Sequence, residues 1–144
     1  MQTFLPYPDF ERCAYVLDDK RLGKQSVEGN QILGALLEGR GWGNHPATLM
    51  WRGAEAALVE YQLAMIREWQ HRGFNAPKRI ERLGELIFNH DLGRGEPLWV
   101  PLGARFHRSH RSNLLRKDPT HYRRYWPKLP DDLPYVWPTH EVTE

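Results

Sequence analysis

The chain of 144 residues has little of what covalent cross-links and membrane spans require. Its single cysteine, Cys13, excludes a disulfide within the chain and any zinc site built from several cysteines. It has no run of about 18 apolar residues, the length that a membrane-spanning helix needs. The first residues lack the basic segment and apolar run of a secretory signal. We therefore expect a protein of the reducing cytoplasm without a membrane segment.

The sequence also lacks the alternation of apolar and polar residues that marks half-buried strands, and it has no internal repeat. Apolar residues instead recur at helical spacing in four stretches, at about 18–38, 46–72, 79–88 and 103–117. This pattern predicts an all-α fold of about four helices in a single compact domain covering 1–144. The proline-rich C-terminal tail carries aromatic residues, so we expect it to pack on the body.

Common catalytic motifs are missing as well. There is no Walker loop, no nucleophile elbow and no dinucleotide-binding fingerprint. Cys13 has no base near it in the sequence and is expected to be a small buried residue. His107 and His110 share a helical face and could in principle bind a metal, but no third ligand follows at a suitable spacing. A structural or phosphate-contacting role is favoured, and we expect no metal and no cofactor.

Positive charge is concentrated in one segment, which we call the basic block, residues 105–128. It holds eight lysines and arginines against one acid, Asp118, although the whole chain has 20 basic and 18 acidic residues. Three aromatic residues, Tyr122, Tyr125 and Trp126, lie among the charges. Cations neutralise phosphates and flat rings stack on bases, so the block is typical of a nucleic-acid-binding surface. A solvated basic helix face is the alternative at this point.

The stretch 18–38 combines a helical pattern with residues that are unusual for a helix. Glycines occur inside it although each costs roughly 1 kcal/mol relative to alanine. Arg21, Lys24 and Glu28 fall on one side at helical spacing. They are candidates for a reactive site, and a surface ion pair between Lys24 and Glu28 is the plainer interpretation. Close packing against another helix is the plainer explanation of the glycines.

Several motifs in chain order carry a family resemblance. They are Leu17-Asp18 followed by Leu22 and Glu28, Trp42-x-Asn44-His45-Pro46, Arg72-Gly73-Phe74-Asn75, and Pro119-Thr120-x-Tyr122-x-x-Tyr125. With them the chain resembles the pyrimidine-dimer DNA glycosylase family, which includes endonuclease V-like enzymes. It is most similar to a phage and bacterial branch that shares the Lys-Arg-Leu-Gly-Lys-Gln block at 20–25 and the segment around His107. The resemblance covers nearly the whole chain, and the family is all-helical.

The resemblance implies a glycosylase and abasic-site lyase that needs no metal. An N-terminal amine attacks the sugar of a damaged or modified pyrimidine in double-stranded DNA, and a glutamate on the first long helix assists. Carried onto this sequence, the catalytic residues are Met1, Glu28, Arg21 and Lys24, and an alternative register places Gln25 at the carboxylate position. The implied DNA-binding residues are His45, His107, Arg108, His110, Arg111, Tyr122, Arg123, Arg124, Tyr125 and Trp126. We expect a monomer.

One departure from the family concerns the start of the chain. The family exposes the amine of a small second residue after its methionine is removed, whereas residue 2 here is Gln2. Met1 should therefore stay, and either its amine is the nucleophile or the N-terminal mechanism is absent. A base-modifying transferase on the same scaffold and a non-catalytic DNA-binding protein are the alternative functions. The sequence does not name the lesion.

Overall fold

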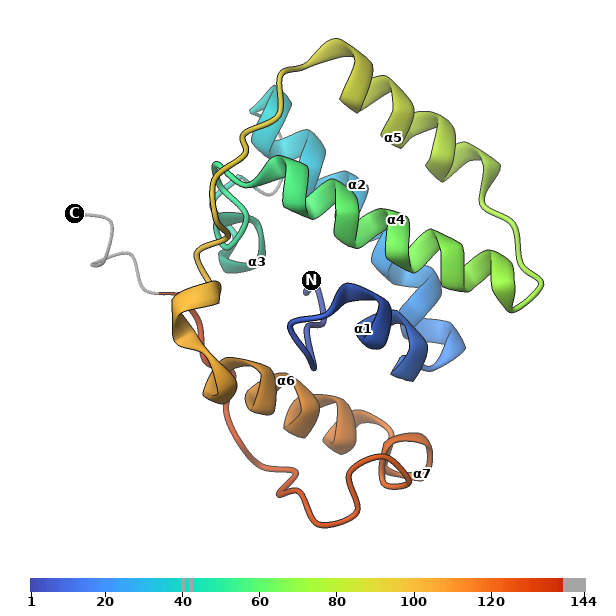
Figure 1. Ribbon diagram of the computed structural model, residues 1–144, viewed down its shortest axis with the longest axis vertical. Helices are drawn as coiled ribbons and strands as arrows, with labels where there is room; N and C mark the ends of the chain where they lie inside the picture. Colours follow the sequence, from blue (N-terminus) through green and yellow to red (C-terminus); the bar gives the residue numbers. More distant parts are fainter. Residues whose placement is uncertain (40, 42, 139–144) are drawn as a thin grey trace.

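Helices form the whole regular structure of the residues that a computed structural model describes, which are 1–39, 41 and 43–138. Trp42 of the family motif lies outside these residues. The elements are α1 (Phe10–Val16), α2 (Asp19–Glu38), α3 (Pro46–Leu49), α4 (Glu55–His71), α5 (Pro77–Asn89), the 3₁₀ turn η1 (Val100–Leu102), α6 (Ala104–Lys117) and α7 (Pro119–Tyr122) (Figure 1). The predicted all-α class is confirmed, with more helices than the four expected.

The long helix α2 begins and ends where the sequence predicted. Asp18 is its N-cap and accepts a hydrogen bond from the Arg21 backbone N–H. Gly39 ends it in the left-handed conformation at φ 70°, and its N–H donates to the Ala35 carbonyl. Helices α5 and α6 also match the predicted stretches to within about two residues at each end.

The prediction of one continuous helix over 46–72 is wrong. The chain leaves the helical path after α3 and turns at Gly53, whose φ is 78°. The loop that precedes η1 then pairs with this turn, because Gly95 N–H donates to the Gly53 carbonyl at 2.9 Å and Leu98 N–H to the Met50 carbonyl at 3.1 Å. The buried carboxylate of Glu55 fixes the same turn by accepting from the Gly53 N–H at 2.9 Å. The spacing of apolar residues within 46–72 could not indicate this break, because the break is fixed by a loop that is distant in sequence.

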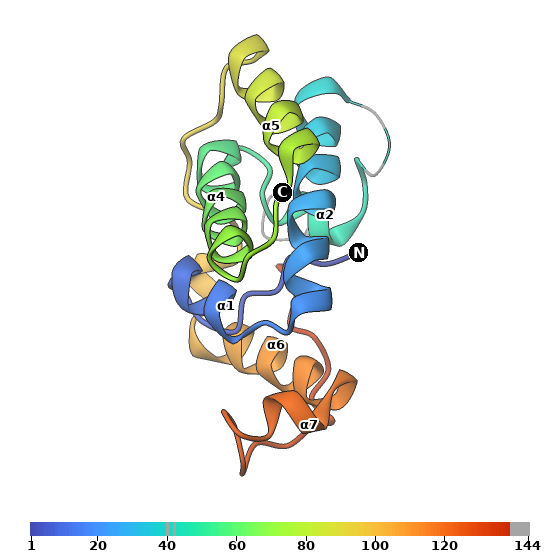
Figure 2. The same cartoon turned by 90° about the vertical axis from the view of Figure 1, so that its right-hand side faces the viewer.

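Two groups of helices make up the body. Helix α2 packs against α4 and α5, and α1 packs against α4. Helices α6 and α7 lie at the end of the molecule opposite to α5, and α1 lies between them and α4 (Figures 1 and 2). The large side chains Trp51, Tyr61 and Phe106 are fully buried where these groups meet. No helix in the described part of the chain is long and apolar enough to cross a membrane.

The C-terminal tail packs on the body, as expected. The Ser112 hydroxyl donates to the Pro130 carbonyl at 2.7 Å and accepts from the Leu133 N–H at 3.0 Å. One helical turn earlier, the Ser109 hydroxyl accepts from the Val136 N–H at 3.1 Å. Polar residues of α6 therefore hold the tail along the helix as far as residue 136.

Candidate active site

The first six residues form an extended arm that is held in the interior. Gln2, Thr3, Phe4, Leu5 and Pro6 are all buried. In Figure 2 the arm, drawn in darker blue, passes beside the middle of α2, which is drawn in lighter blue. The arm brings the start of the chain to the face of α2 that carries the candidate residues.

The side-chain amide of Gln25 on α2 holds the arm through two hydrogen bonds. Its Oε1 accepts from the Phe4 N–H at 2.8 Å, and its Nε2 donates to the Gln2 carbonyl at 3.2 Å. The hydroxyl of Tyr61 lies 2.5 Å from the same Oε1 and 2.7 Å from the Phe4 carbonyl. Gln25 is 1% exposed, so its amide is committed to the backbone of the arm. In the alternative register of the family motif, Gln25, which binds the arm here, would occupy the catalytic carboxylate position.

Two histidines of α6 hold the arm from the other side. Nδ1 of His110 accepts from the Leu5 N–H at 2.9 Å, and Nδ1 of His107 lies 2.8 Å from the Leu5 carbonyl. Burial lowers the pKa of both rings, that of His110 to about 3. His110 is 0% and His107 5% exposed, and together they satisfy both backbone groups of Leu5. Their contact with DNA stays a prediction.

A pocket of about 320 Å³ opens where the arm begins. From the arm and α2 it is lined by Met1, Gln2, Phe4, Lys20, Arg21, Lys24, Gln25 and Glu28, and from α6 and the tail by Lys117, Tyr135 and Trp137. Four of the predicted residues, Met1, Arg21, Lys24 and Glu28, are thus brought together. Glu28 is the only carboxylate among the lining residues, against four cationic side chains and the chain's first amine.

Glu28 is half-buried and accepts one weak hydrogen bond, from Gln25 Nε2 at 3.4 Å. Among the described residues no ion pair to Lys24 forms, so the plainer interpretation of this pair is wrong. Lys24 is exposed at the rim, and Arg21 is held by Asp18 at 3.2 Å. The Glu28 carboxylate is therefore left facing the pocket and available to a bound molecule.

His45 belongs to the same electrostatic environment. It is the N-cap of α3, and its Nδ1 accepts from the Ala47 N–H at 3.0 Å. Burial lowers the pKa of His45, the positive charge of the Met1 amine lowers it further, and the Glu28 carboxylate raises it. The amine and the carboxylate therefore both act on the His45 imidazole, with opposite signs. The contact of His45 with DNA stays a prediction.

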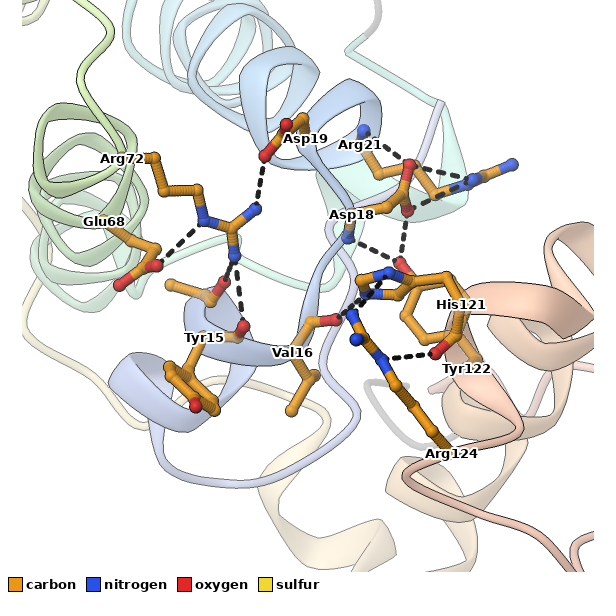
Figure 3. A network of polar contacts seen from close by, with 11 residues as sticks. Tyr15, Val16, Asp18, Asp19, Arg21, Glu68, Arg72, His121, Tyr122 and Arg124 are labelled. Atoms are coloured by element: carbon orange, nitrogen blue, oxygen red, sulfur yellow. Dashed lines mark hydrogen bonds and ion pairs between the residues drawn. The ribbon is translucent and has the colours of Figure 1, made fainter.

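The N-terminus of α2 is tied to α7 by a polar network (Figure 3). The Tyr122 hydroxyl donates to the Asp18 carboxylate and accepts from the Asp18 N–H at 3.0 Å. His121 Nε2 lies 2.8 Å from the Val16 carbonyl, and Arg124 donates to the His121 carbonyl at 3.1 Å. Burial raises the pKa of Asp18, but the hydrogen bonds from Tyr122 and Arg21 outweigh it and the net shift is downward.

The aromatic residues of the basic block are mostly internal. Tyr122 is fully buried and stacks on Trp126 at a centroid distance of 5.5 Å. Trp126 is 9% exposed and donates its Nε1–H to the Tyr7 hydroxyl at 2.9 Å. These two rings pack α7 against Tyr7 and the N-terminus of α2, and their contact with DNA stays a prediction. Tyr125 is half-buried beside Arg124, 5.1 Å from its guanidinium, and its role stays a prediction.

Much of the positive charge in the block is also used within the molecule. Arg111 donates to the Pro6 carbonyl at 2.7 Å and lies over the Tyr7 ring. Arg123 donates to the Leu129 carbonyl at 3.1 Å. Arg108, in contrast, is exposed, and the structure records no hydrogen bond or ion pair for it within the described chain. Part of the block therefore holds the arm and the tail, and the contact of Arg108, Arg111, Arg123 and Arg124 with DNA stays a prediction.

Several residues of the pocket were not among the predicted site residues. Lys20 and Lys117 add positive charge to its rim, and Tyr135 and Trp137 add ring surface to its wall. Lys20 could have been found, because it lies four residues before Lys24 on the same helix face. Lys117 and the two rings reach the pocket only through the packing of α6 and the tail, and no local pattern indicates that packing.

An amine, a carboxylate and a rim of cations thus meet in one open pocket of an all-helical protein. The chain belongs to the pyrimidine dimer DNA glycosylase family, whose model matches residues 1–81. The matched part contains the arm, α2 and α3, and hence Met1, Arg21, Lys24, Glu28 and His45. No curated protein and no solved structure matches the chain. Membership makes DNA the substrate and base excision the activity at the level of the family.

Proposed function

We propose that the protein is a DNA glycosylase and abasic-site lyase that uses the Met1 amine as its nucleophile on a damaged or modified pyrimidine. The amine nitrogen bonds to C1′ of the sugar, and the base leaves with the electrons of the glycosidic bond and a proton. Opening of the sugar ring gives an imine between Met1 and C1′. Loss of a C2′ proton from this imine then expels the 3′ phosphate and nicks the strand.

The observation that carries this proposal is the meeting of Met1 and Glu28 in one pocket beneath the buried arm. As a class, α-amino groups titrate near 8, more than two units below lysine side chains, so a useful fraction is neutral and nucleophilic at cellular pH. A carboxylate beside the imine stabilises its positive charge and can accept the C2′ proton. Glu28 is the lining residue with that chemistry.

The rim of the pocket supports a polyanionic substrate. Lys20, Lys24 and Lys117 are exposed there, and Arg21 lies beside them. Cations at these positions can neutralise the phosphates on either side of the target nucleotide, which supplies affinity without reading sequence. The arrangement requires the nucleotide to approach α2 from the side on which the arm begins.

The variant Glu28→Gln tests this assignment. The amide keeps an oxygen that can accept from Gln25, so the fold and DNA binding should persist while charge stabilisation is lost. We expect strand cleavage at an abasic site to fall on the order of 100-fold or more, measured in single turnover. Glu85→Gln, on the exposed face of α5, is the matched control and should cleave like the wild type.

Borohydride reduction supplies the complementary measurement, because it traps an imine as a stable adduct. Wild-type protein incubated with abasic-site duplex and borohydride should become covalently attached to the DNA. Binding without cleavage or adduct would instead favour a non-catalytic DNA-binding protein.

A further inference from the structure

Gln2 brings an unpartnered side-chain nitrogen to the pocket that holds Met1 and Glu28. The side chain lines this pocket although it is only 6% exposed. Its Nε2 is buried and makes no hydrogen bond within the described structure, and no other residue that lines the pocket has a buried side-chain polar atom in this state. A buried donor without an acceptor is unfavourable, and an acceptor on a bound molecule relieves this cost.

The amide of Gln2 is held in one orientation. Its Oε1 accepts from the Thr3 N–H at 3.0 Å, which leaves Nε2 as the other end of the amide. The Gln2 carbonyl accepts from Gln25 Nε2 at 3.2 Å, so the backbone of the same residue is tied to α2. The donor is therefore preorganised, because a ligand gains the hydrogen bond without having to order the side chain first.

The part of the pocket at Gln2 is sheltered from water. Burial raises the pKa of Tyr135, another lining residue, to about 12, against the opposing effects of Arg116 and of the Gln2 side chain. The phenol therefore stays neutral at cellular pH. An amide NH₂ has two hydrogens, so contact with one phenol oxygen still leaves a hydrogen for a ligand. A hydrogen bond in such surroundings is stronger than the same bond in water.

We propose that Gln2 stabilises the departing base, because its Nε2 donates to the O2 carbonyl oxygen of the pyrimidine whose C1′ the Met1 amine attacks. This inference rests on the proposed function. Gln2 follows Met1 directly in the chain, and O2 lies on the ring carbon next to N1, the base atom that is bonded to C1′. A donor one residue from the nucleophile is thus suited to the acceptor beside the bond that breaks.

This hydrogen bond strengthens as the reaction proceeds. The Met1 nitrogen bonds to C1′ while the bond from C1′ to N1 breaks, and the electrons of that bond pass to the base. They are shared between N1 and O2, so O2 becomes more negative in the transition state. The proton lost by the Met1 nitrogen then neutralises the base at N1. A fixed donor at an atom where charge develops lowers the barrier of this step.

The test separates departure of the base from the chemistry of the amine. Base release is followed in single turnover on a duplex with a pyrimidine dimer. Borohydride trapping is followed on the same duplex with an abasic site, which has no base to expel. Gln2→Met keeps a long side chain and removes the donor. We expect it to slow base release on the order of 100-fold, the scale of one lost transition-state donor, and to leave trapping within about twofold of wild type.

Two further variants separate the donor from the structure of the arm. Gln2→Glu keeps an oxygen for the Thr3 N–H but has no donor when ionised, so it should also slow base release. Methionine and glutamate are as large as glutamine, so Met1 should stay in place in both variants. Gln31→Met makes the same change at an exposed residue of α2 outside the pocket and should alter neither reaction.

The outcomes distinguish this inference from the proposed function. Unchanged base release in Gln2→Met would overturn the inference, and so would an equal fall in base release and trapping, which would indicate a displaced arm. Wild-type protein that traps at the abasic site but releases no base from the dimer would overturn it as well. Wild-type protein that neither releases a base nor forms an adduct would overturn the proposed function itself.

Discussion

His110 shows how a titratable residue can be central to a site without entering it. Its ring is fully buried, accepts from the Leu5 N–H at 2.9 Å, and has no hydrogen-bond partner at Nε2 within the described structure. The neutral ring therefore carries its proton on Nε2, because Nδ1 is the acceptor. Protonation of Nδ1 would break the bond to the arm and place a charge in the core. The hydrogen bond between the arm and α6 at Leu5 depends on this ring staying neutral.

This residue predicts a pH dependence of stability. The pKa of His110 is about 3 when folded and 6.5 in the unfolded chain, so the unfolded state binds the extra proton between these values. The stability contribution is present above pH 6.5 and declines as pH falls toward 3. Between pH 7.5 and pH 5 the loss from this one group should be about 2 kcal/mol in the free energy of unfolding by urea.

His110→Asn is the matched variant, because the amide oxygen can still accept from Leu5 but does not titrate. The variant should lose less stability than the wild type over the same pH interval, by the amount assigned to His110. His107 has the same direction of shift and remains in both proteins, so it cancels in the comparison. Identical pH dependence in the two proteins would show that His110 is not held neutral.

At the same scale, the sequence identified Glu28, Arg21 and Lys24 because all three lie on one face of a single helix. Through the family resemblance it favoured Glu28 as the carboxylate position and left Gln25 as the alternative. Both residues line the pocket, but the arm occupies the Gln25 amide with two backbone hydrogen bonds, and this contact has no signature in the sequence. For His107 and His110 the sequence left a structural and a phosphate-contacting role open, because a histidine that binds a buried backbone group has no signature in spacing or composition.

At the scale of the element, the glycines of α2 differ in how closely neighbouring side chains pack against them. A Cβ built on Gly29 would lie 2.6 Å from Gln62 Cγ, and one on Gly23 would lie 2.8 Å from the ring of Trp69. A Cβ on Gly34 would lie 3.5 Å from its nearest neighbour, an ordinary contact. Close helix packing, the plainer explanation of these glycines, therefore holds for the first two and fails for the third.

Gly29→Ala and Gly34→Ala form a matched pair that tests this contrast. Gly29→Ala must displace Gln62, which is buried and donates to Asn30 at 2.6 Å, so it should lower the free energy of unfolding by about 1–3 kcal/mol. Gly34→Ala has room for its methyl group and should leave stability unchanged or raise it by up to about 1 kcal/mol. Urea unfolding of the two variants measures both effects. Equal destabilisation would contradict the packing of α2 on α4.

The elements themselves were predictable where one amphipathic pattern had clear caps, as in α2 with Asp18 and Gly39. They were not predictable where contacts with a segment distant in sequence determine the course of the backbone. The break between α3 and α4 depends on the loop around Gly93 and Gly95, whose backbone lies against Gly53. Helices α1 and α7 are short, with 7 and 4 residues, so they present too few turns for periodicity to register.

At the scale of the whole molecule, the site exists because three distant segments converge. The arm brings Met1, α2 brings Glu28 with its cations, and the tail brings Tyr135 and Trp137. The sequence indicated the first two through the family resemblance. It could not place the tail, because the serines and the asparagine of α6 that anchor it resemble ordinary surface residues until the fold buries them. The family match supports the activity, and this convergence supports the nucleophile.

The identity of the atom that bonds to the sugar tests this account most directly. Wild-type protein is incubated with abasic-site duplex and borohydride, the adduct is digested with protease and nuclease, and the modified peptide is sequenced by mass spectrometry. The account predicts that the reduced sugar is attached to the α-nitrogen of Met1, and that acetylation of this amine abolishes the adduct. Attachment to the side chain of Lys20, Lys24 or Lys117, which lie at the same pocket, would contradict it.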